Sequence, residues 1–90
     1  MPETTIRSPR FKRGQVNIFY NAAKRSEIIR NREELRERYP NERLGESPLG
    51  RLILYAPPYW NGSTWMYPYE YGTFGTHEGY AAEEDLEQIK

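Results

Sequence analysis

The hydrophobic and polar positions of this chain alternate most regularly over residues 64–71. Every second position there is a large aromatic residue, and a period of two is typical of a β-strand with one buried face. The tripeptide Asn61-Gly62-Ser63 precedes this run, and an Asn-Gly step between strand-forming runs is a strong hairpin signal. The pattern therefore predicts a hairpin whose return strand carries one row of rings, namely Trp65, Tyr67, Tyr69 and Tyr71.

Three shorter runs of strand-forming residues, each next to a glycine or a proline, predict the rest of a sheet. These runs cover residues 15–20, 51–55 and 79–82. In the first run, Val16, Ile18 and Tyr20 fall on one face. Pro68 lies inside the return strand but has no N–H to donate, so we expect it at a sheet edge or at a bulge.

The clearest predicted helix spans residues 26–39, which contain no glycine or proline and consist mostly of good helix formers. Either Asn21 or Ser26 can act as its N-cap, and Pro40 ends it. Its apolar side chains form one narrow stripe, made of Ile28, Ile29, Leu35 and Tyr39. This amphipathic pattern predicts that one side of the helix packs on the sheet while the charged side faces water.

Ninety residues allow one domain with a small core. We interpret residues 1–10 as a flexible basic arm and residues 11–90 as the single domain. The chain has no cysteine, which excludes disulfides and thiolate metal ligands. It shows neither an apolar run long enough to span a membrane nor the start of a signal peptide, so we expect a cytoplasmic protein without membrane contact.

The charges are unevenly distributed, although the net charge is zero. Residues 1–51 hold 12 basic and 7 acidic residues, whereas residues 52–90 hold 1 basic and 6 acidic residues. Such an asymmetry can steer an anionic partner to one end, or it can hold the two halves of the folded chain together. We favour the second interpretation because it requires no partner.

Four short motifs occur in the order found in small SH3-like barrels. They are the opening strand at 11–16 (FKRGQV), the second strand at 50–54 (GRLIL), the central strand at 65–71 (WMYPYEY), and at 82–87 (AEEDLE) the helical turn before the last strand pairing. The chain resembles this family, which implies a strongly bent, SH3-like antiparallel sheet. The helix predicted at 26–39 lies where such barrels have only a loop, so we expect an α+β fold in which a partly open barrel carries one inserted amphipathic helix at about 26–39. Barrels of this type commonly bind peptides, protein subunits or nucleic acid.

Residues that carry catalysis or bind metal ions are scarce in this chain. His77 is the only histidine and Asp85 the only aspartate, and neither lies in a catalytic motif. His77 and Glu78 supply at most two ligands, whereas a zinc site needs three or four. The acidic residues at 83–87 lack the ligand spacing of an EF-hand loop and are expected to form an exposed helical end. We therefore expect no catalytic site, no metal and no cofactor.

Aromatic residues are better candidates for a functional site, since nine of them lie between Tyr55 and Tyr80. We expect the rings of the return strand to form mainly the inward face of the sheet, but so small a core cannot hold all of them. Tyr59 and Trp60, beside Pro57-Pro58, are the strongest candidates for exposure. Exposed aromatic and arginine side chains are typical of interface hot spots.

Two functions fit these residues. The first is a small non-enzymatic protein–protein interaction module, an adaptor or regulator, that contacts another protein through an aromatic patch and an arginine-rich helix face: Tyr59, Trp60, Trp65, Tyr67, Arg30, Arg32 and Arg36. The alternative is a nucleic-acid-binding protein that stacks bases on the same aromatics and binds phosphates through Arg7, Arg10, Lys12, Arg13, Lys24 and Arg25. The zero net charge favours the first function, because nucleic-acid binders usually carry a basic excess.

Overall fold

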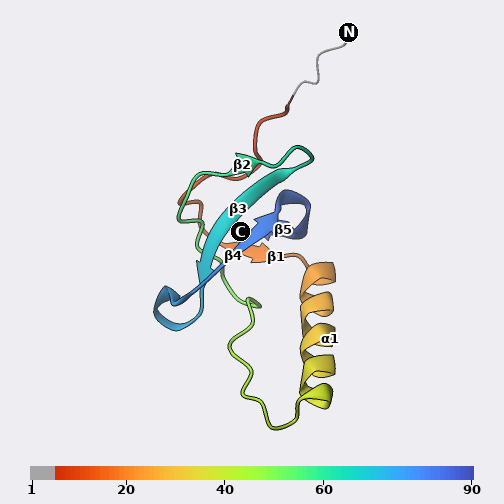
Figure 1. Ribbon diagram of the computed structural model, residues 1–90. Coiled ribbons are helices and arrows are strands. Elements are labelled where there is room, and N and C mark those ends of the chain that lie inside the picture. The colour runs from red at the N-terminus through yellow and green to blue at the C-terminus, as the bar shows by residue number, and fades with distance from the viewer. Residues whose placement is uncertain (1–5) are drawn as a thin grey trace.

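Two antiparallel sheets and one helix make up the structure, a computed structural model that describes residues 6–90 apart from the side chain of Phe74 (Figure 1). The smaller sheet pairs β1 (Ile18–Tyr20) with β5 (Leu86–Gln88). The larger sheet has the order β2 (Tyr59–Trp60), β3 (Trp65–Tyr71) and β4 (His77–Ala82). The helix α1 (Ala22–Arg38) follows β1, and the 3₁₀ turns η1 (Thr73–Gly75) and η2 (Glu83–Asp85) precede β4 and β5. The fold is α+β, and neither sheet closes into a barrel.

The two sheets are joined through Leu52 and Ile53. The N–H of Leu52 donates to the carbonyl of Ile18 in β1 at 2.8 Å. Ile53 and Glu70 of β3 exchange two hydrogen bonds of 2.9 Å each. Neighbouring antiparallel segments therefore run in the order β5, β1, residues 52–53, β3 and β4.

The predicted hairpin is present, with β2 as its first arm, while the run at 51–55 forms isolated pairings at Leu52 and Ile53 instead of the predicted strand. Tyr59 of β2 pairs with Met66 of β3, and the connecting turn starts at Asn61. The side-chain oxygen of Asn61 accepts the N–H groups of the second and third residues that follow it, each at 2.9 Å. Gly62 has a φ of 102°, which L side chains rarely adopt, so the Asn-Gly step does set this turn.

Pro68 lies in the middle of β3, and the neighbouring segment explains why the strand tolerates it. Glu70 directs its N–H and its carbonyl toward Ile53, so the even-numbered residues of β3 face that side. Residues 54–58, between Ile53 and β2, form no ladder with β3. The N–H that Pro68 lacks would therefore point at a gap in the neighbouring strand, which is a local sheet edge of the kind expected for this residue.

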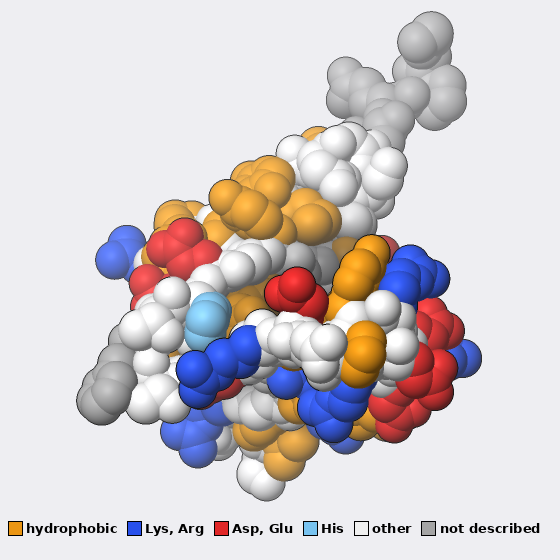
Figure 2. Space-filling model, turned by 60° about the horizontal axis from the view of Figure 1, so that its bottom comes forward, with side chains coloured by type: hydrophobic (Ala, Val, Ile, Leu, Met, Phe, Trp, Pro, Cys, Tyr) orange, Lys and Arg blue, Asp and Glu red, His pale blue; other side chains and the backbone are white. Residues whose placement is uncertain are grey.

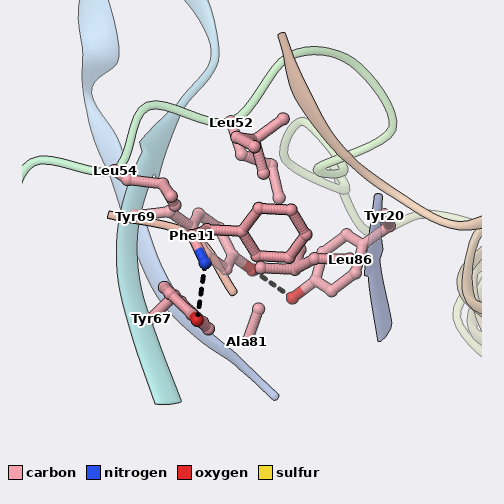
Figure 3. Close-up of a cluster of buried hydrophobic side chains, with 9 residues drawn as sticks. Phe11, Tyr20, Leu52, Leu54, Tyr67, Tyr69, Ala81 and Leu86 are labelled. Atoms are coloured by element: carbon pink, nitrogen blue, oxygen red, sulfur yellow. Dashed lines mark hydrogen bonds between the residues drawn. The ribbon is translucent and has the colours of Figure 1, made fainter. Parts of the chain in front are cut away.

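The core consists of side chains from both sheets and from the segments that lead into them (Figure 3). Its buried members are Phe11, Ile18, Tyr20, Leu52, Leu54, Tyr67, Tyr69, Ala81 and Leu86. Tyr67 and Tyr69 point inward from the centre of β3, while Trp65 and Tyr71 at its ends are half-buried, which confirms the predicted inward face. The hydroxyls of Tyr20 and Tyr69 share a hydrogen bond of 2.8 Å.

Val16 is 66% exposed, although the alternation placed it on the same face as Ile18 and Tyr20. Asn17, which separates Val16 from Ile18, has a φ of 62°, in the left-handed region. The extended backbone that an alternation requires therefore begins only at Ile18. For this reason β1 starts later than the predicted strand at 15–20.

The helix α1 begins at Ala22, with Asn21 as its N-cap, whose side-chain oxygen accepts the N–H of Lys24 at 2.9 Å. None of its residues is buried, and the stripe residues Ile29 and Leu35 are 45% and 44% exposed. The prediction that the helix packs one side on the sheet is therefore wrong. Within the stripe only Ile28 contacts the core, and Figure 1 shows α1 standing beside the strands.

The basic arm predicted at residues 1–10 is partly tied to the domain, and residues 1–5 lie outside the described residues. The indole N–H of Trp65 donates to the carbonyl of Arg7 at 2.7 Å. Arg7 and Arg10 both donate to the carboxylate of Glu83. The segment from Arg7 onward therefore belongs to the folded domain, and the expected boundary at residue 11 falls inside a region of contact.

Gly79 should be essential for the packing of the aromatic core. It pairs with Tyr69, and a Cβ at this position would lie 2.5 Å from the Tyr69 hydroxyl oxygen. Because Gly79→Ala must displace the ring that bonds to Tyr20, we expect the free energy of unfolding to fall by about 1–3 kcal/mol in urea denaturation. A Cβ at Gly45 meets no atom within 4 Å, so Gly45→Ala should change stability by less than about 0.5 kcal/mol. Equal losses in the two variants would contradict the packing role.

Asn21 should contribute to stability as a cap, and Ser26 should not. Beyond its bond from Lys24, the Asn21 amide donates to the carbonyl of Glu84 at 2.9 Å, which links α1 to η2. We expect Asn21→Ala to lower the free energy of unfolding by about 1–2 kcal/mol, measured by urea denaturation. Ser26 is exposed inside the helix, so Ser26→Ala should stay within about 0.5 kcal/mol of the wild type. A larger loss for Ser26→Ala than for Asn21→Ala would identify Ser26 as the cap.

Candidate functional site

Glu83 is the one charged side chain that is fully buried within residues 6–90. One carboxylate oxygen accepts from the Tyr67 hydroxyl at 2.8 Å and from the N–H of Arg10 at 3.1 Å, and the other accepts from the Arg7 guanidinium. Burial by itself would raise the pKa of Glu83, but these hydrogen bonds and the positive charge of Arg7 hold it below its ordinary value. All of these donors belong to the chain itself, so the carboxylate has a structural role: it links segments of the fold by hydrogen bonds. Its burial corrects the expectation of an exposed acidic end.

Tyr67 belongs to the buried hydrogen-bond network around Glu83 and not to a contact surface. Its hydroxyl donates to Glu83 and accepts the N–H of Phe11 at 3.2 Å, as Figure 3 shows for Phe11. The side chain is fully buried, and burial raises the pKa of Tyr67 to about 12. The hypothesis that Tyr67 contacts a partner is therefore wrong, because it has no surface to present.

The other residues of the predicted aromatic and arginine patch are spread over separate parts of the molecule. Tyr59 is exposed on β2, whereas Trp60 and Trp65 are half-buried and pack edge to face with ring centroids 5.8 Å apart. Arg30 and Arg36 are exposed on α1, which Figure 1 places well away from β2. The structure therefore does not bring the helix arginines to the aromatic patch.

Arg32 has a structural role on α1. It interrupts the apolar stripe, and its guanidinium donates to the carbonyl of Gly45 and to the hydroxyl of Ser47, the latter at 2.8 Å. A longer contact of 3.5 Å reaches the carbonyl of Leu44. Arg32 thus holds the loop that follows the helix, which explains why this loop, and not the sheet, lies along α1.

The basic residues considered for phosphate binding are largely engaged within the chain. Arg7 bonds to Glu83, while Lys24 and Arg25 lie 3.5 Å from the carboxylates of Glu27 and Glu87, respectively. The guanidinium of Arg10 lies over the ring of Phe11, 5.4 Å from its centroid, and Lys12 and Arg13 are exposed. On the face that Figure 2 draws, basic and acidic side chains are interspersed.

Among the aromatic rings of the larger sheet, the most exposed lie on the face that points away from the core. Side chains alternate along a strand, so the burial of Tyr69 and Ala81 turns their neighbours Pro68 and Tyr80 to the opposite face. Tyr80 is 63% exposed and Tyr59 is 45% exposed. Their rings meet edge to face, with centroids 6.3 Å apart, across Pro68 and Met66 of β3.

Tyr55 and Ile53 extend the same surface. Ile53, 51% exposed, pairs with Glu70, whose neighbour on β4 is Glu78. Tyr55 is 36% exposed and lies two residues after Ile53, so alternation about the buried Leu54 turns its side chain to the same face. The pKa of the Tyr55 phenol is raised, first by partial desolvation and then by the negative charge of Glu78. We call this surface the outer tyrosine face; it consists of Ile53, Tyr55, Tyr59 and Tyr80 with Glu70 and Glu78 along one side.

The sequence reasoning found Tyr59 but missed Tyr55 and Tyr80. The signal was present in both runs, because Leu52 and Leu54 alternate with Ile53 and Tyr55 just as Ala81 alternates with Tyr80. The most regular row of rings lies on β3, the strand whose aromatic side chains turn inward. An apolar hollow of about 220 Å³ between residues 14–16 and 51–54 adjoins the outer tyrosine face at Ile53.

The single histidine and the acidic residue Glu46 make contacts inside the chain. His77 stacks on Tyr71 with ring centroids 5.1 Å apart, and Glu46 accepts the N–H and the hydroxyl of Thr73 at 3.2 and 3.1 Å. Within residues 6–90 there is no group of three or more metal-binding side chains. These contacts fix the loop after α1 against η1.

Comparison with protein-family models, with curated proteins and with solved structures found no match. The SH3-like resemblance therefore stays a prediction. Over the part of the chain that the structure describes, no helix is both long and apolar enough to cross a membrane.

Glu83 should give the fold a defined sensitivity to acid. Because its pKa is lower in the folded chain, its contribution is complete above the ordinary glutamate pKa of about 4.3 and is lost as the pH falls below this value. Glu83→Gln should lower the free energy of unfolding by about 2–3 kcal/mol at pH 7, and this deficit should shrink on going to pH 3. Urea denaturation at both pH values measures the difference.

Glu37→Gln is the matched control, since Glu37 is exposed on α1. It should remain within about 0.5 kcal/mol of the wild type at pH 7. A deficit of Glu83→Gln that is the same at pH 7 and pH 3 would show that the loss comes from packing and not from the charge.

Proposed function

We propose that this protein is a non-enzymatic protein-interaction module, an adaptor or regulator, that contacts its partner through the outer tyrosine face. The observation that supports this most directly is the exposure of Tyr80 and Tyr59 on a sheet whose other face forms the core. In a small domain, aromatic rings that are exposed to water stabilise the fold less than buried rings would. Contact with a partner restores that burial, and tyrosine is enriched at such contacts because its ring is large and its hydroxyl can bond.

We also propose an open SH3-like barrel as the finer description of the fold. In support, β5 pairs with β1 directly after the single turn η2, as the resemblance implies. Residues 52–53 bridge β1 and β3 in the position of the second strand. In this description α1 is an insertion between the first and second strands, and the open sheet leaves the outer tyrosine face uncovered. The cytoplasmic location stays a prediction.

Tyr59, a member of the patch predicted from the sequence, is also part of the proposed contact surface. Tyr55 and Tyr80 take the place of Tyr67, because pairing and alternation turn their rings to the same side of the sheet as Tyr59. Trp60 is half-buried and lies at the margin of this surface, next to Tyr59 in β2. The arginines of α1 are not part of it.

Nucleic-acid binding has less support. Glu70 and Glu78 border the outer tyrosine face, so phosphates near its rings would meet negative charge. Arg7 and Arg25, expected to bind phosphates, lie against Glu83 and Glu87 instead. Retention of a single-stranded oligonucleotide with a steep dependence on salt would favour this alternative.

The double variant Tyr59→Thr/Tyr80→Thr should lose its partner while it keeps its fold. Both positions are exposed and threonine suits a strand, so the circular dichroism spectrum and the urea midpoint should stay close to the wild type. Quantitative capture from cells of the source organism, followed by titration of the captured protein, should show affinity at least about tenfold lower.

Leu35→Gln is the matched control, because it removes an equally exposed apolar side chain from α1. It should leave the captured partner and its affinity unchanged. If the double tyrosine variant binds the same partner as tightly as the wild type, the outer tyrosine face is not the contact surface.

A further inference from the structure

The outer edge of β4 carries main-chain groups that point away from the sheet. Glu70 directs its N–H and carbonyl away from β4, so its pair Glu78 directs its own groups away from β3. Tyr80, two residues further along β4, has the same orientation. Within residues 6–90, β4 pairs with β3 alone. The N–H and carbonyl groups of Glu78 and Tyr80 therefore line an edge that can accept another strand.

The two edges of the larger sheet differ in how they are protected. Folded proteins usually block an edge strand by making it short, by adding proline or charge, or by a bulge. β2 is two residues long and follows Pro57-Pro58, so its edge is blocked. β4 contains six residues without proline and keeps one register with β3 from His77 to Ala82. Its exposed Glu78 is the one charged group on this edge.

The side chains at this edge favour a particular kind of strand. Tyr80 offers an exposed ring, and Glu78, two residues away on the same face, offers an exposed carboxylate. Glu70 adds a second carboxylate beside Glu78, and neither forms an ion pair with any residue of the described chain. A strand laid along β4 would place an apolar side chain or an arginine over the ring, and a cation beside the carboxylates.

We propose that the partner adds an extended basic segment as a further strand along β4. Main-chain hydrogen bonds to Glu78 and Tyr80 hold the segment, and alternate side chains contact the Tyr80 ring and pair with Glu78 and Glu70. This inference rests on the proposed function and specifies the form and charge of the segment that the outer tyrosine face binds.

A designed peptide tests the proposal on the full chain. Three repeats of Val-Thr-Lys-Thr place valine and lysine alternately on one face of a strand, as the positions of Tyr80 and Glu78 require. In a titration followed by ¹⁵N-¹H NMR, the largest shifts should occur in β4. The exchange of the Glu78 and Tyr80 amide protons with solvent should slow at least tenfold in the complex.

Two altered peptides separate the main-chain from the charge contribution. N-methylation of the amides on one edge of the peptide keeps every side chain but removes the bonds to β4, and it should weaken binding at least tenfold. Replacing the lysines by glutamates should weaken binding to a similar extent. Equal binding by the N-methylated and the original peptide would overturn strand addition.

A charge exchange gives a test that does not depend on a loss alone. Glu78→Lys should weaken binding of the lysine peptide at least tenfold and should strengthen binding of the glutamate peptide. Glu37→Lys, on exposed α1, makes the same change of charge elsewhere and should alter neither affinity by more than about twofold. Because the Glu78→Lys variant is expected to bind the glutamate peptide more tightly, this gain shows both that the variant is folded and that residue 78 contacts the peptide.

Other outcomes would overturn the proposal. Shifts confined to residues 14–16 and 51–54 would place the peptide in the hollow beside Ile53. A dimer in sedimentation that Glu78→Pro abolishes would assign the edge to a second copy of this chain. Loss of the captured partner in the double tyrosine variant without protection of the Glu78 and Tyr80 amides would leave the interaction function standing and refute strand addition alone.

Discussion

The buried carboxylate of Glu83 holds the fold together, because it joins three segments that are distant in the sequence. Arg7 and Arg10 reach it from the start of the domain, and Tyr67 reaches it from the centre of β3. The Tyr67 hydroxyl in turn accepts the N–H of Phe11, so this hydrogen-bond network also holds the segment that carries Phe11 into the core. Charge-assisted hydrogen bonds are about twice as strong as neutral ones, which suits a chain with little apolar area to bury. With η2 anchored in this way, the chain emerges in position to pair β5 with β1.

The features that the sequence predicted correctly depend on local chemistry. The Asn61-Gly62 step forms the turn because the asparagine side chain bonds to the following N–H groups and glycine accepts a positive φ. The period of two along β3 gives the inward side chains of Tyr67 and Tyr69, and Asn21 caps the helix in the way its residue type favours. Such signals involve residues within a few positions of one another, so they can be interpreted from the chain alone.

The features that were wrong depend on contacts across the molecule. Nothing in the acidic run at 83–87 marks Glu83 as the buried member, because its donors Arg7 and Arg10 lie more than 70 residues away and Tyr67 lies on another strand. The stripe on α1 predicted a packed helix, but Arg32 turns to the following loop and leaves Leu35 in water. These outcomes are decided by tertiary contacts.

The placement of the prolines makes the two edges of the larger sheet, β2 and β4, unequal. Pro57-Pro58 and the gap opposite Pro68 interrupt the hydrogen bonding between Ile53 and β2, whereas β4 keeps one register with β3 along its whole length. A strand docked at β4 would extend the series of neighbouring segments that runs from β5 through β1, residues 52–53 and β3 to β4. Growth of the larger sheet by strand addition is therefore directional: β4 can accept a further strand, whereas β2 is too short and too close to proline to do so.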